Sequence, residues 1–224
     1  SNSEAAIISL SNNFLLRINF FSKRSSFVWA SISNCSCSRK SERYLLDEIR
    51  ESELLDYFLK QKQDEKAAGK KNYRKSISDA LNFFIRENLE NQGWQKEPKI
   101  FKNPDYEASA WRLDFAKNDI CVEVAFNHRE AVPHNMLKAV LSTEGNDMLE
   151  KEYISQIGVI ITATKELKKT GNFDNAAGTF DDYVELLKPY SFFIRCPMII
   201  IGLEGLETFY IDKKTKLPVK STSQ

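Results

Sequence analysis

The stretch LDFAKNDICVEVAFN, residues 113–127, decides the fold of this 224-residue chain. Ala110–Phe115 and Ile120–Phe126 are largely apolar and predict two antiparallel strands, with the polar residues 116–119 as the turn between them. Side chains along a strand point alternately to opposite faces of a sheet. One face of the second strand is therefore predicted to be buried, and it carries Ile120, Val122, Val124 and Phe126.

Two carboxylates fall on the opposite face of this hairpin. If the turn is centred on residues 117–118, Asp114 pairs with Cys121, and Asp114 becomes a diagonal neighbour of Glu123, roughly 7–8 Å away at Cα. Both carboxylates can then reach one cation about 2.1 Å from each oxygen, and Mg²⁺ prefers oxygen ligands, among them a backbone carbonyl such as that of Val124. The same spacing also suits the solvent face of a half-exposed hairpin, so periodicity alone leaves both interpretations open.

Helices and buried strands are predicted on either side of the hairpin. Apolar residues recur at helical spacing in four segments, residues 44–63, 76–91, 134–149 and 180–187. The short apolar runs Ile157–Thr162 and Met198–Gly202 are typical of strands buried on both faces of a sheet. This order predicts an α/β domain with a central mixed sheet flanked by helices.

Composition divides the chain into three predicted segments. Residues 1–43 are rich in Ser and Asn and form an N-terminal arm, residues 44–206 form the core domain, and residues 207–224 form a peripheral strand and a basic tail. No run of 18 apolar residues occurs, so no membrane span is expected. The four cysteines lack the spacing of a zinc site, and scattered thiols favour the reducing cytoplasm.

The overall charge does not indicate a nucleic-acid binder. The chain has 32 basic and 31 acidic side chains, a net charge of +1 and a sequence pI near 7.6. A strongly basic domain is the usual electrostatic footprint of such proteins. Any contact with DNA must therefore depend on a few locally placed residues.

Taken together, the motifs resemble the BglII/BamHI-like branch of the type II restriction endonucleases, within the PD-(D/E)XK nuclease superfamily. In that family an Asp on one strand precedes a Glu on the next by nine residues, inside a DF…VEVxF frame that Asp114 and Glu123 reproduce here. The strand Gly158–Thr162 resembles the family's downstream V-(A/G)-I-I-I-T strand, and the similarity covers residues 76–204. The upstream N-xx-I-xxx-L-xxxx-W pattern is matched by Asn82, Ile85, Leu89 and Trp94.

The resemblance implies a restriction-endonuclease-like core that cleaves double-stranded DNA with the help of Mg²⁺. It implies a short palindromic target and hence a homodimer with two-fold symmetry. Asp114 and Glu123 would be the catalytic residues and, with the carbonyl of Val124, the metal ligands. The residues implied to contact DNA are Asn127, His128, Arg129, Asn135, Lys138, Thr164 and Lys165.

Ala125 departs from the family pattern. Its position usually holds Lys, Glu or Gln, which positions or deprotonates the attacking water, and a methyl group can do neither. The role can have migrated to Asn127, His128 or Lys138, or the metal-bound water and the substrate phosphate can act without it. Alternatively, the chain is a DNA-binding protein that has lost catalysis. A structure-directed nuclease is a third hypothesis, disfavoured by the recognition-type residues that follow Glu123.

Overall fold

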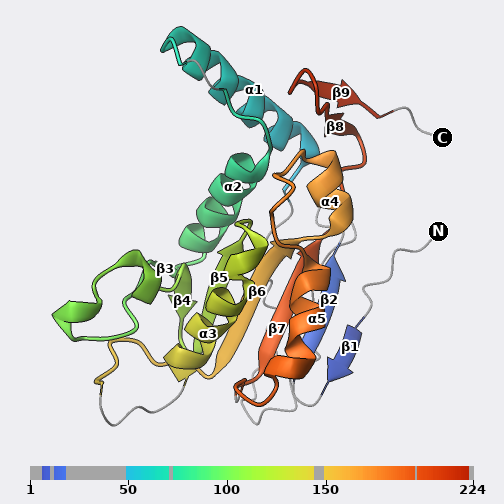
Figure 1. Ribbon diagram of the computed structural model, residues 1–224. Helices are drawn as coiled ribbons and strands as arrows, with labels where there is room; N and C mark the ends of the chain where they lie inside the picture. The colour runs from blue at the N-terminus through green and yellow to red at the C-terminus, as the bar shows by residue number, and fades with distance from the viewer. Residues whose placement is uncertain are drawn as a thin grey trace.

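A mixed β-sheet forms the centre of the protein. The computed structural model describes residues 7–10, 13–18, 49–70, 73–143, 149–194 and 196–221. Within these residues, seven strands are hydrogen-bonded in the order β1-β2-β7-β6-β5-β4-β3 (Figure 1). The strands β2, β7, β6 and β5 run parallel, whereas β1, β4 and β3 pair antiparallel. They are β1 Ile7–Leu10, β2 Asn13–Ile18, β3 Gln95–Lys96, β4 Phe115–Lys117, β5 Ile120–Ala125, β6 Ile157–Ala163 and β7 Met198–Leu203.

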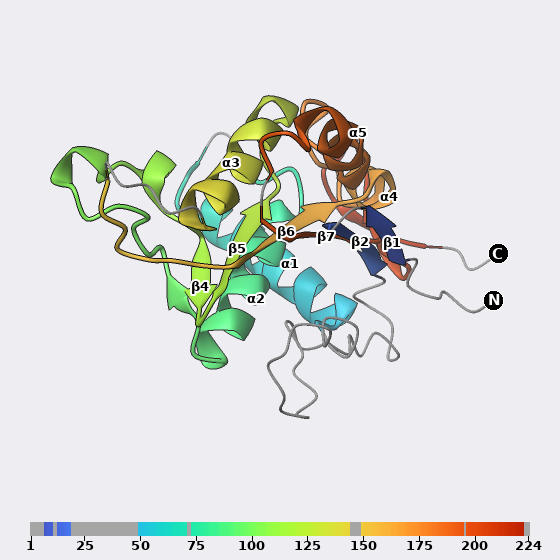
Figure 2. The same ribbon diagram turned by 90° about the horizontal axis from the view of Figure 1, so that it is seen from below.

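Helices cover both faces of this sheet. Seen from below, α3 and α5 lie on one face and α1 and α2 on the other, which confirms the predicted α/β architecture (Figure 2). The helices are α1 Glu51–Ala67, α2 Ser78–Asn91, α3 Val132–Thr143, α4 Lys165–Thr170 and α5 Phe180–Tyr190. None of the helices in the described part of the chain is long and apolar enough to cross a membrane.

The central strands are apolar because both of their faces are buried. In β6, Val159 and Ile161 pack with α1 and α2, whereas Ile160 points to the side of α3 and α5. In β7, Ile199 and Ile200 divide between the two sides in the same way. The predicted pair of strands buried on both faces is confirmed, and burial of these side chains supplies much of the driving force for folding.

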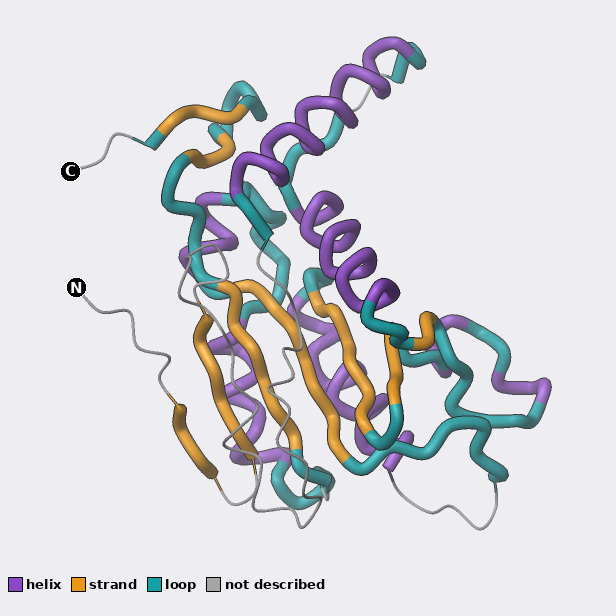
Figure 3. The backbone as a smooth tube through the Cα atoms, turned by 180° about the vertical axis from the view of Figure 1, so that it is seen from behind, coloured by secondary structure: helices purple, strands orange, loops and turns teal. Residues whose placement is uncertain are grey.

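The first helix extends past the end of the sheet, as the view from behind shows (Figure 3). Its start is fixed by Glu51, whose carboxylate accepts the backbone N–H groups of Glu207 at 2.6 Å and Thr208 at 2.7 Å. This contact joins α1 to the segment before the small hairpin of β8 (Phe209–Ile211) and β9 (Pro218–Lys220). The predicted peripheral strand is thus a two-stranded hairpin.

Several predicted boundaries are wrong. The first helix, predicted over residues 44–63, is α1 Glu51–Ala67, and residues 49 and 50 before it are not helical. Ala110–Phe115 is not a strand: residues 109–111 form a 3-10 turn, and β4 starts only at Phe115. The helix predicted over residues 134–149 begins at Val132 and is described as far as Thr143, and residues 144–148 lie outside the described residues. Its first turn includes Pro133, which is tolerated because the N–H groups there have no acceptor within the helix.

The N-terminal segment contributes to the sheet, which its composition did not predict. Within the predicted arm, β1 and β2 form the edge of the sheet, and β2 pairs in parallel with β7. The other residues of the arm, 1–6, 11–12 and 19–43, lie outside the described residues. Cys35 and Cys37 are among them.

Candidate active site

Asp114 and Glu123 lie level with each other on neighbouring strands. The observed register pairs Phe115 with Val122 and Lys117 with Ile120, so the turn consists of residues 118–119. This register is shifted by two residues from the predicted one, and a shift of two keeps every side chain on its predicted face. The two carboxylates therefore share a face as predicted, but they are opposite neighbours and not diagonal ones.

Backbone hydrogen bonds orient both carboxylates. The N–H group of Val124 donates to Oδ2 of Asp114 at 2.7 Å, and the N–H group of Asp114 donates to Oε1 of Glu123 at 3.3 Å. Each acid is thus tied to the backbone that carries the other. This reciprocal arrangement fixes the two side chains close together at the beginning of β4 and the middle of β5.

Glu123 is not on a solvent-exposed face. Its side chain is only 2% exposed, whereas that of Asp114 is 39% exposed. A buried carboxylate is costly unless a counter-charge accompanies it. Here the ammonium group of Lys138, on α3, donates to Oε2 of Glu123 and lies 4.0 Å from Oδ1 of Asp114. The alternative of a half-exposed hairpin is therefore excluded for Glu123.

A stripe of polar side chains on α3 faces β5. Asn135, Lys138 and Ser142 are all buried, and their spacing of three and then four residues places them on one side of the helix. Each one meets a residue on the same face of β5 or just beyond its end. The pairs are Asn135 with Asn127, Lys138 with Glu123, and Ser142 with Cys121. This register of helix against strand brings the lysine to the carboxylates.

The surroundings disfavour negative charge on both acids. Burial, and then the neighbouring Asp114 carboxylate, raise the pKa of Glu123 to about 8 against the attraction of Lys138. Burial also raises the pKa of Asp114, while Lys138 and the Val124 N–H group oppose this rise. Two carboxylates that repel each other in a site of low polarity would be relieved by a bound cation. The electrostatics of the pair thus fit a metal site.

The donor set fits a hard divalent cation of the Mg²⁺ type. The carboxylates of Asp114 and Glu123 lie on one face of the hairpin and could hold it together, and the carbonyl of Val124 stays a predicted ligand. Among the described residues there is no group of three or more His, Cys, Asp or Glu side chains placed to hold a metal. Mg²⁺ commonly keeps several waters and takes only one or two carboxylates together with substrate phosphate, so a sparse set of this kind is sufficient.

Burial of Glu123 should make the stability of the metal-free protein depend on pH. Because folding raises its pKa from 4.5 to about 8, the folded state binds this proton more tightly than the unfolded state. The resulting stabilisation is complete below pH 4.5, the pKa of Glu123 in the unfolded chain, and is lost as the pH rises through about 8, its pKa in the folded protein. In EDTA, we expect the Tm of the wild type to fall relative to that of Glu123→Gln across this window. A difference in Tm that stays constant with pH would contradict this expectation.

A comparison of the sequence with models of protein families shows to which proteins the chain is related. Residues 39–203 match the family of the restriction endonucleases BglII and BglIII. The chain belongs to this family. Among solved structures, the crystal structure of restriction endonuclease BglII complexed with a DNA 16-mer is similar, with 21% sequence identity and a TM-score of 0.47. The similarity covers 62% of this chain and 65% of that chain. No curated protein matches the sequence.

In this member of the BglII/BglIII family, Ala125, the position that departs from the family pattern, lies in the core between β5 and α3. Ala125 is 2% exposed and packs in the same apolar cluster as Met136 and Ala139 of α3. Of the three residues to which its role was predicted to migrate, Lys138 contacts the carboxylates. The other two lie at the end of β5: Asn127 accepts a hydrogen bond from Asn135 at 3.2 Å, and His128 is exposed.

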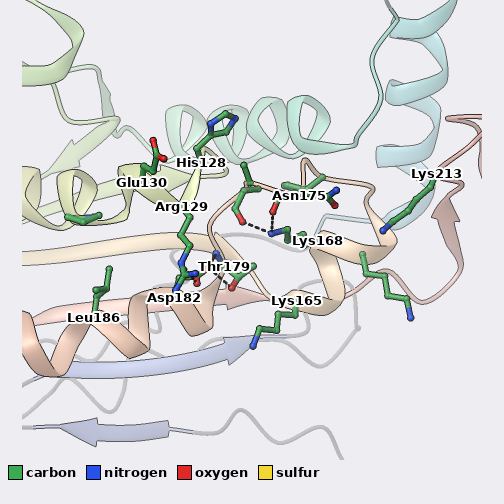
Figure 4. A pocket seen from close by; sticks show the side chains of 15 residues that line it. His128, Arg129, Glu130, Lys165, Lys168, Asn175, Thr179, Asp182, Leu186 and Lys213 are labelled. Carbon is green, nitrogen blue, oxygen red and sulfur yellow. Dashed lines mark hydrogen bonds and ion pairs between the residues drawn. The ribbon is translucent and has the colours of Figure 1, made fainter.

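Three of the predicted DNA-binding residues line an open cleft beyond the end of β5. His128, Arg129 and Lys165 face it, together with further basic side chains from α4 and from residue 213 (Figure 4). Arg129 extends towards α5, where it pairs with Asp182 at 2.8 Å and with Glu185 at 3.2 Å. Lys165 pairs with Asp181 at 3.2 Å. These cations are exposed, but acidic partners already accompany them.

The wall of this cleft is held in place by Lys168, which the sequence did not single out as a structural residue. Its ammonium group donates to the carbonyl oxygens of Asn175 at 2.8 Å and Ala177 at 2.7 Å (Figure 4). The same loop accepts the N–H group of Arg129 through the carbonyl of Ala176. Lys168 therefore links α4 to the loop beside the end of β5.

Of the other predicted DNA-binding residues, Asn127 is exposed, whereas Asn135, Lys138 and Thr164 are buried. Thr164 is fully buried, and its hydroxyl caps α4 by accepting the N–H group of Leu167 at 3.2 Å. Asn135 and Lys138 were assigned to DNA because they were expected at an exposed helix start, but they face the sheet. Asn135 also donates to the hydroxyl of the buried Tyr183 at 2.9 Å. The inward-facing spacing of the polar residues on α3 was the signal that would have revealed this.

Proposed function

We propose that the protein is a Mg²⁺-dependent, sequence-specific endonuclease that hydrolyses double-stranded DNA, with a core of the PD-(D/E)XK type. The observation that carries this proposal is the buried Glu123 carboxylate beside Asp114 at the hairpin, inside a domain of the BglII/BglIII family. A protein that needed only stability would gain little from burying two neighbouring carboxylates. Such a pair is typical of a metal-assisted active site.

The reaction is the hydrolysis of one phosphodiester bond in each strand. The oxygen of a water molecule bonds to phosphorus, the bond from phosphorus to one deoxyribose oxygen breaks, and a proton from the water ends on that oxygen. When bound, Mg²⁺ supplies a water of lowered pKa and a positive charge opposite the phosphate. Asp114, Glu123 and the Val124 carbonyl would hold the cation, and the two backbone hydrogen bonds to the carboxylates restrict the orientation of these side chains.

DNA lies along the cleft beyond the end of β5 in this proposal. Asn127, His128 and Arg129 follow the catalytic strand directly and are exposed there. Asn and Arg side chains can each form paired hydrogen bonds with base edges in the major groove. The ion pairs of Arg129 and Lys165 are exposed and hence weak, about 0–1 kcal/mol each, so phosphates can replace the acidic partners at small cost. Asn135 and Thr164 would support this surface from beneath.

A homodimer and a palindromic target are part of the proposal. Two copies related by a two-fold axis present identical recognition surfaces to the two halves of a palindromic site, and each copy cuts one strand. Sedimentation of the free protein and of its complex with a specific duplex would measure how many protein chains each species contains.

The cytoplasm is the proposed location of the protein. The free thiol of Cys121 is buried, and burial raises its pKa to about 11, which suits a reduced, unreactive side chain there.

A plasmid digest tests the proposed activity. With Mg²⁺ the protein is expected to convert supercoiled plasmid into a fixed set of linear fragments, and EDTA should prevent cutting.

The competing hypothesis, favoured by Ala125, is a DNA-binding protein without catalytic activity. It predicts specific retention of DNA in a mobility-shift gel but no cutting with Mg²⁺ or Mn²⁺. Binding without cutting would therefore reject the endonuclease.

A further inference from the structure

The position two residues after Glu123 lacks a polar side chain, and α3 closes over it. Ala125 shares the face of Glu123 on β5 and is buried against the apolar side of α3. A short side chain at this position is compatible with a close approach of the helix to the strand. The helix is also close to β6, because a Cβ atom added at Gly158 would lie 2.7 Å from that of Ala139. Side chains of α3 consequently reach the carboxylates.

Lys138 is the side chain of α3 that does so. Its ammonium group is hydrogen-bonded to Oε2 of Glu123 and lies 4.0 Å from Oδ1 of Asp114. The lysine side chain is only 8% exposed, so it is fixed within the site and not free in solvent. An ammonium group has three donors, and the contacts of the described residues use one of them, on Glu123.

We propose that Lys138 is the third catalytic residue and supplies from α3 what Ala125 cannot supply from β5. The inference rests on the proposed nuclease function and refines it. One N–H donor stays on Glu123, and the others are available to the attacking water and to an oxygen of the scissile phosphate. The positive charge stabilises the negative charge that grows on that phosphate, as preorganised donors do in other active sites.

Contacts of the neighbouring residues on α3 hold Lys138 in a fixed position. One turn before it, Asn135 is hydrogen-bonded to both Asn127 and Tyr183. One turn after it, the hydroxyl of Ser142 is 3.3 Å from Sγ of Cys121 on β5 and 2.5 Å from the hydroxyl of Ser155. Both neighbours fix the rotation of α3 relative to the sheet. Precise placement of a donor is what electrostatic catalysis requires, because the donor then needs no reorganisation during the reaction.

Lys138 could instead have a purely structural role as a counter-charge for Glu123. The variant Lys138→Met separates this structural role from the proposed catalytic role. The methionine keeps a long side chain but removes the charge. Lys62→Met is the matched control, because Lys62 is a partly buried lysine on α1 whose ammonium donates to the carbonyl of Lys216, remote from the carboxylates. The measurements are single-turnover cleavage at saturating Mg²⁺, DNA binding in EDTA, and the rise in Tm caused by Mg²⁺.

We expect Lys138→Met to cleave about 10²–10³-fold more slowly, the usual loss for one preorganised donor, with DNA binding in EDTA within a few-fold of wild type. Mg²⁺ should raise its Tm more than that of the wild type, because the competing ammonium is gone. Lys62→Met should cleave normally. Cleavage by Lys138→Met within a few-fold of wild type would overturn the proposal, as would an unchanged response of its Tm to Mg²⁺.

A relocation experiment covers the case in which Lys138→Met folds poorly. The double variant Ala125→Lys/Lys138→Met returns an ammonium group to the same face of the site from β5. It should cleave faster than Lys138→Met, whereas Ala125→Lys alone should not exceed the wild type. A gain of about 100-fold or more in Ala125→Lys alone, the scale of acid–base assistance, would show that the role was vacant and would overturn the proposal. A wild type that cleaves no DNA counts against the nuclease function itself, while the Tm response still tests the Lys138–Glu123 contact.

Discussion

Replacing Glu123 by Gln is expected to lower the rate of DNA cleavage by a factor of about 10³ or more. In the proposed site the carboxylate would hold the cation whose charge stabilises the transition state. That contribution is several kcal/mol, and each 1.36 kcal/mol corresponds to about a factor of ten. Asp114→Asn should have the same effect, because both acids are proposed to hold the same cation. The measurement is single-turnover cleavage of a plasmid that the wild type cuts.

DNA binding separates this loss from unfolding. Both variants should retain specific binding in EDTA, since neither acid is proposed to contact a base. Glu90→Gln, an exposed glutamate on α2, is the matched control and should cleave at the wild-type rate. If either Glu123→Gln or Asp114→Asn kept a rate within about tenfold of wild type, a difference of only about 1.4 kcal/mol, the hairpin would not be the active site.

The second large effect is expected at Gly158, where Ala139 of α3 lies close to the backbone of β6. In Gly158→Ala the new Cβ would lie 2.7 Å from the Cβ of Ala139, a distance that forces the helix and strand apart. Overpacking of this kind typically costs about 1–3 kcal/mol in the free energy of unfolding. Because α3 carries Lys138, cleavage should slow as well. Urea unfolding and single-turnover cleavage measure the two effects.

The partner substitution Ala139→Gly supplies an internal control for this prediction. It removes the atom that the new Cβ would meet, although glycine within a helix itself costs about 1 kcal/mol. In that background, Gly158→Ala should cost much less than it does alone, so the double variant should lose less stability than the sum of the losses of the two single variants. Strictly additive effects would mean that the contact between α3 and β6 does not determine the position of the helix.

The parts of the fold that were predictable from sequence are those fixed by local pattern. The strands β6 and β7 were recognisable because strands buried on both faces are apolar throughout, and α2 because its apolar residues recur at helical spacing. The shared face of Asp114 and Glu123 was predicted correctly in spite of a wrong turn, since the error of two residues preserved the alternation of side chains.

The parts that were missed depend on tertiary contacts. A strand was predicted over Ala110–Phe115, but residues 109–111 form a 3-10 turn, and Arg112 makes only an isolated bridge with Lys99. The sequence indicated Lys138 both as a DNA contact at a helix start and as one of three residues that could replace Ala125, but it did not predict that this lysine is buried. Its partner, Glu123, is distant in sequence, so only the packing of α3 on β5 reveals the pair.

The most direct test of the account is to sequence the DNA ends produced from a long, complex DNA by the wild type with Mg²⁺, beside a Glu123→Gln preparation purified in the same way. We expect the wild-type ends to share one short sequence that reads the same on both strands, and we expect Glu123→Gln to produce no such ends. Ends without a common sequence, or the same ends from both preparations, would contradict the assignment of a sequence-specific endonuclease site to Asp114 and Glu123.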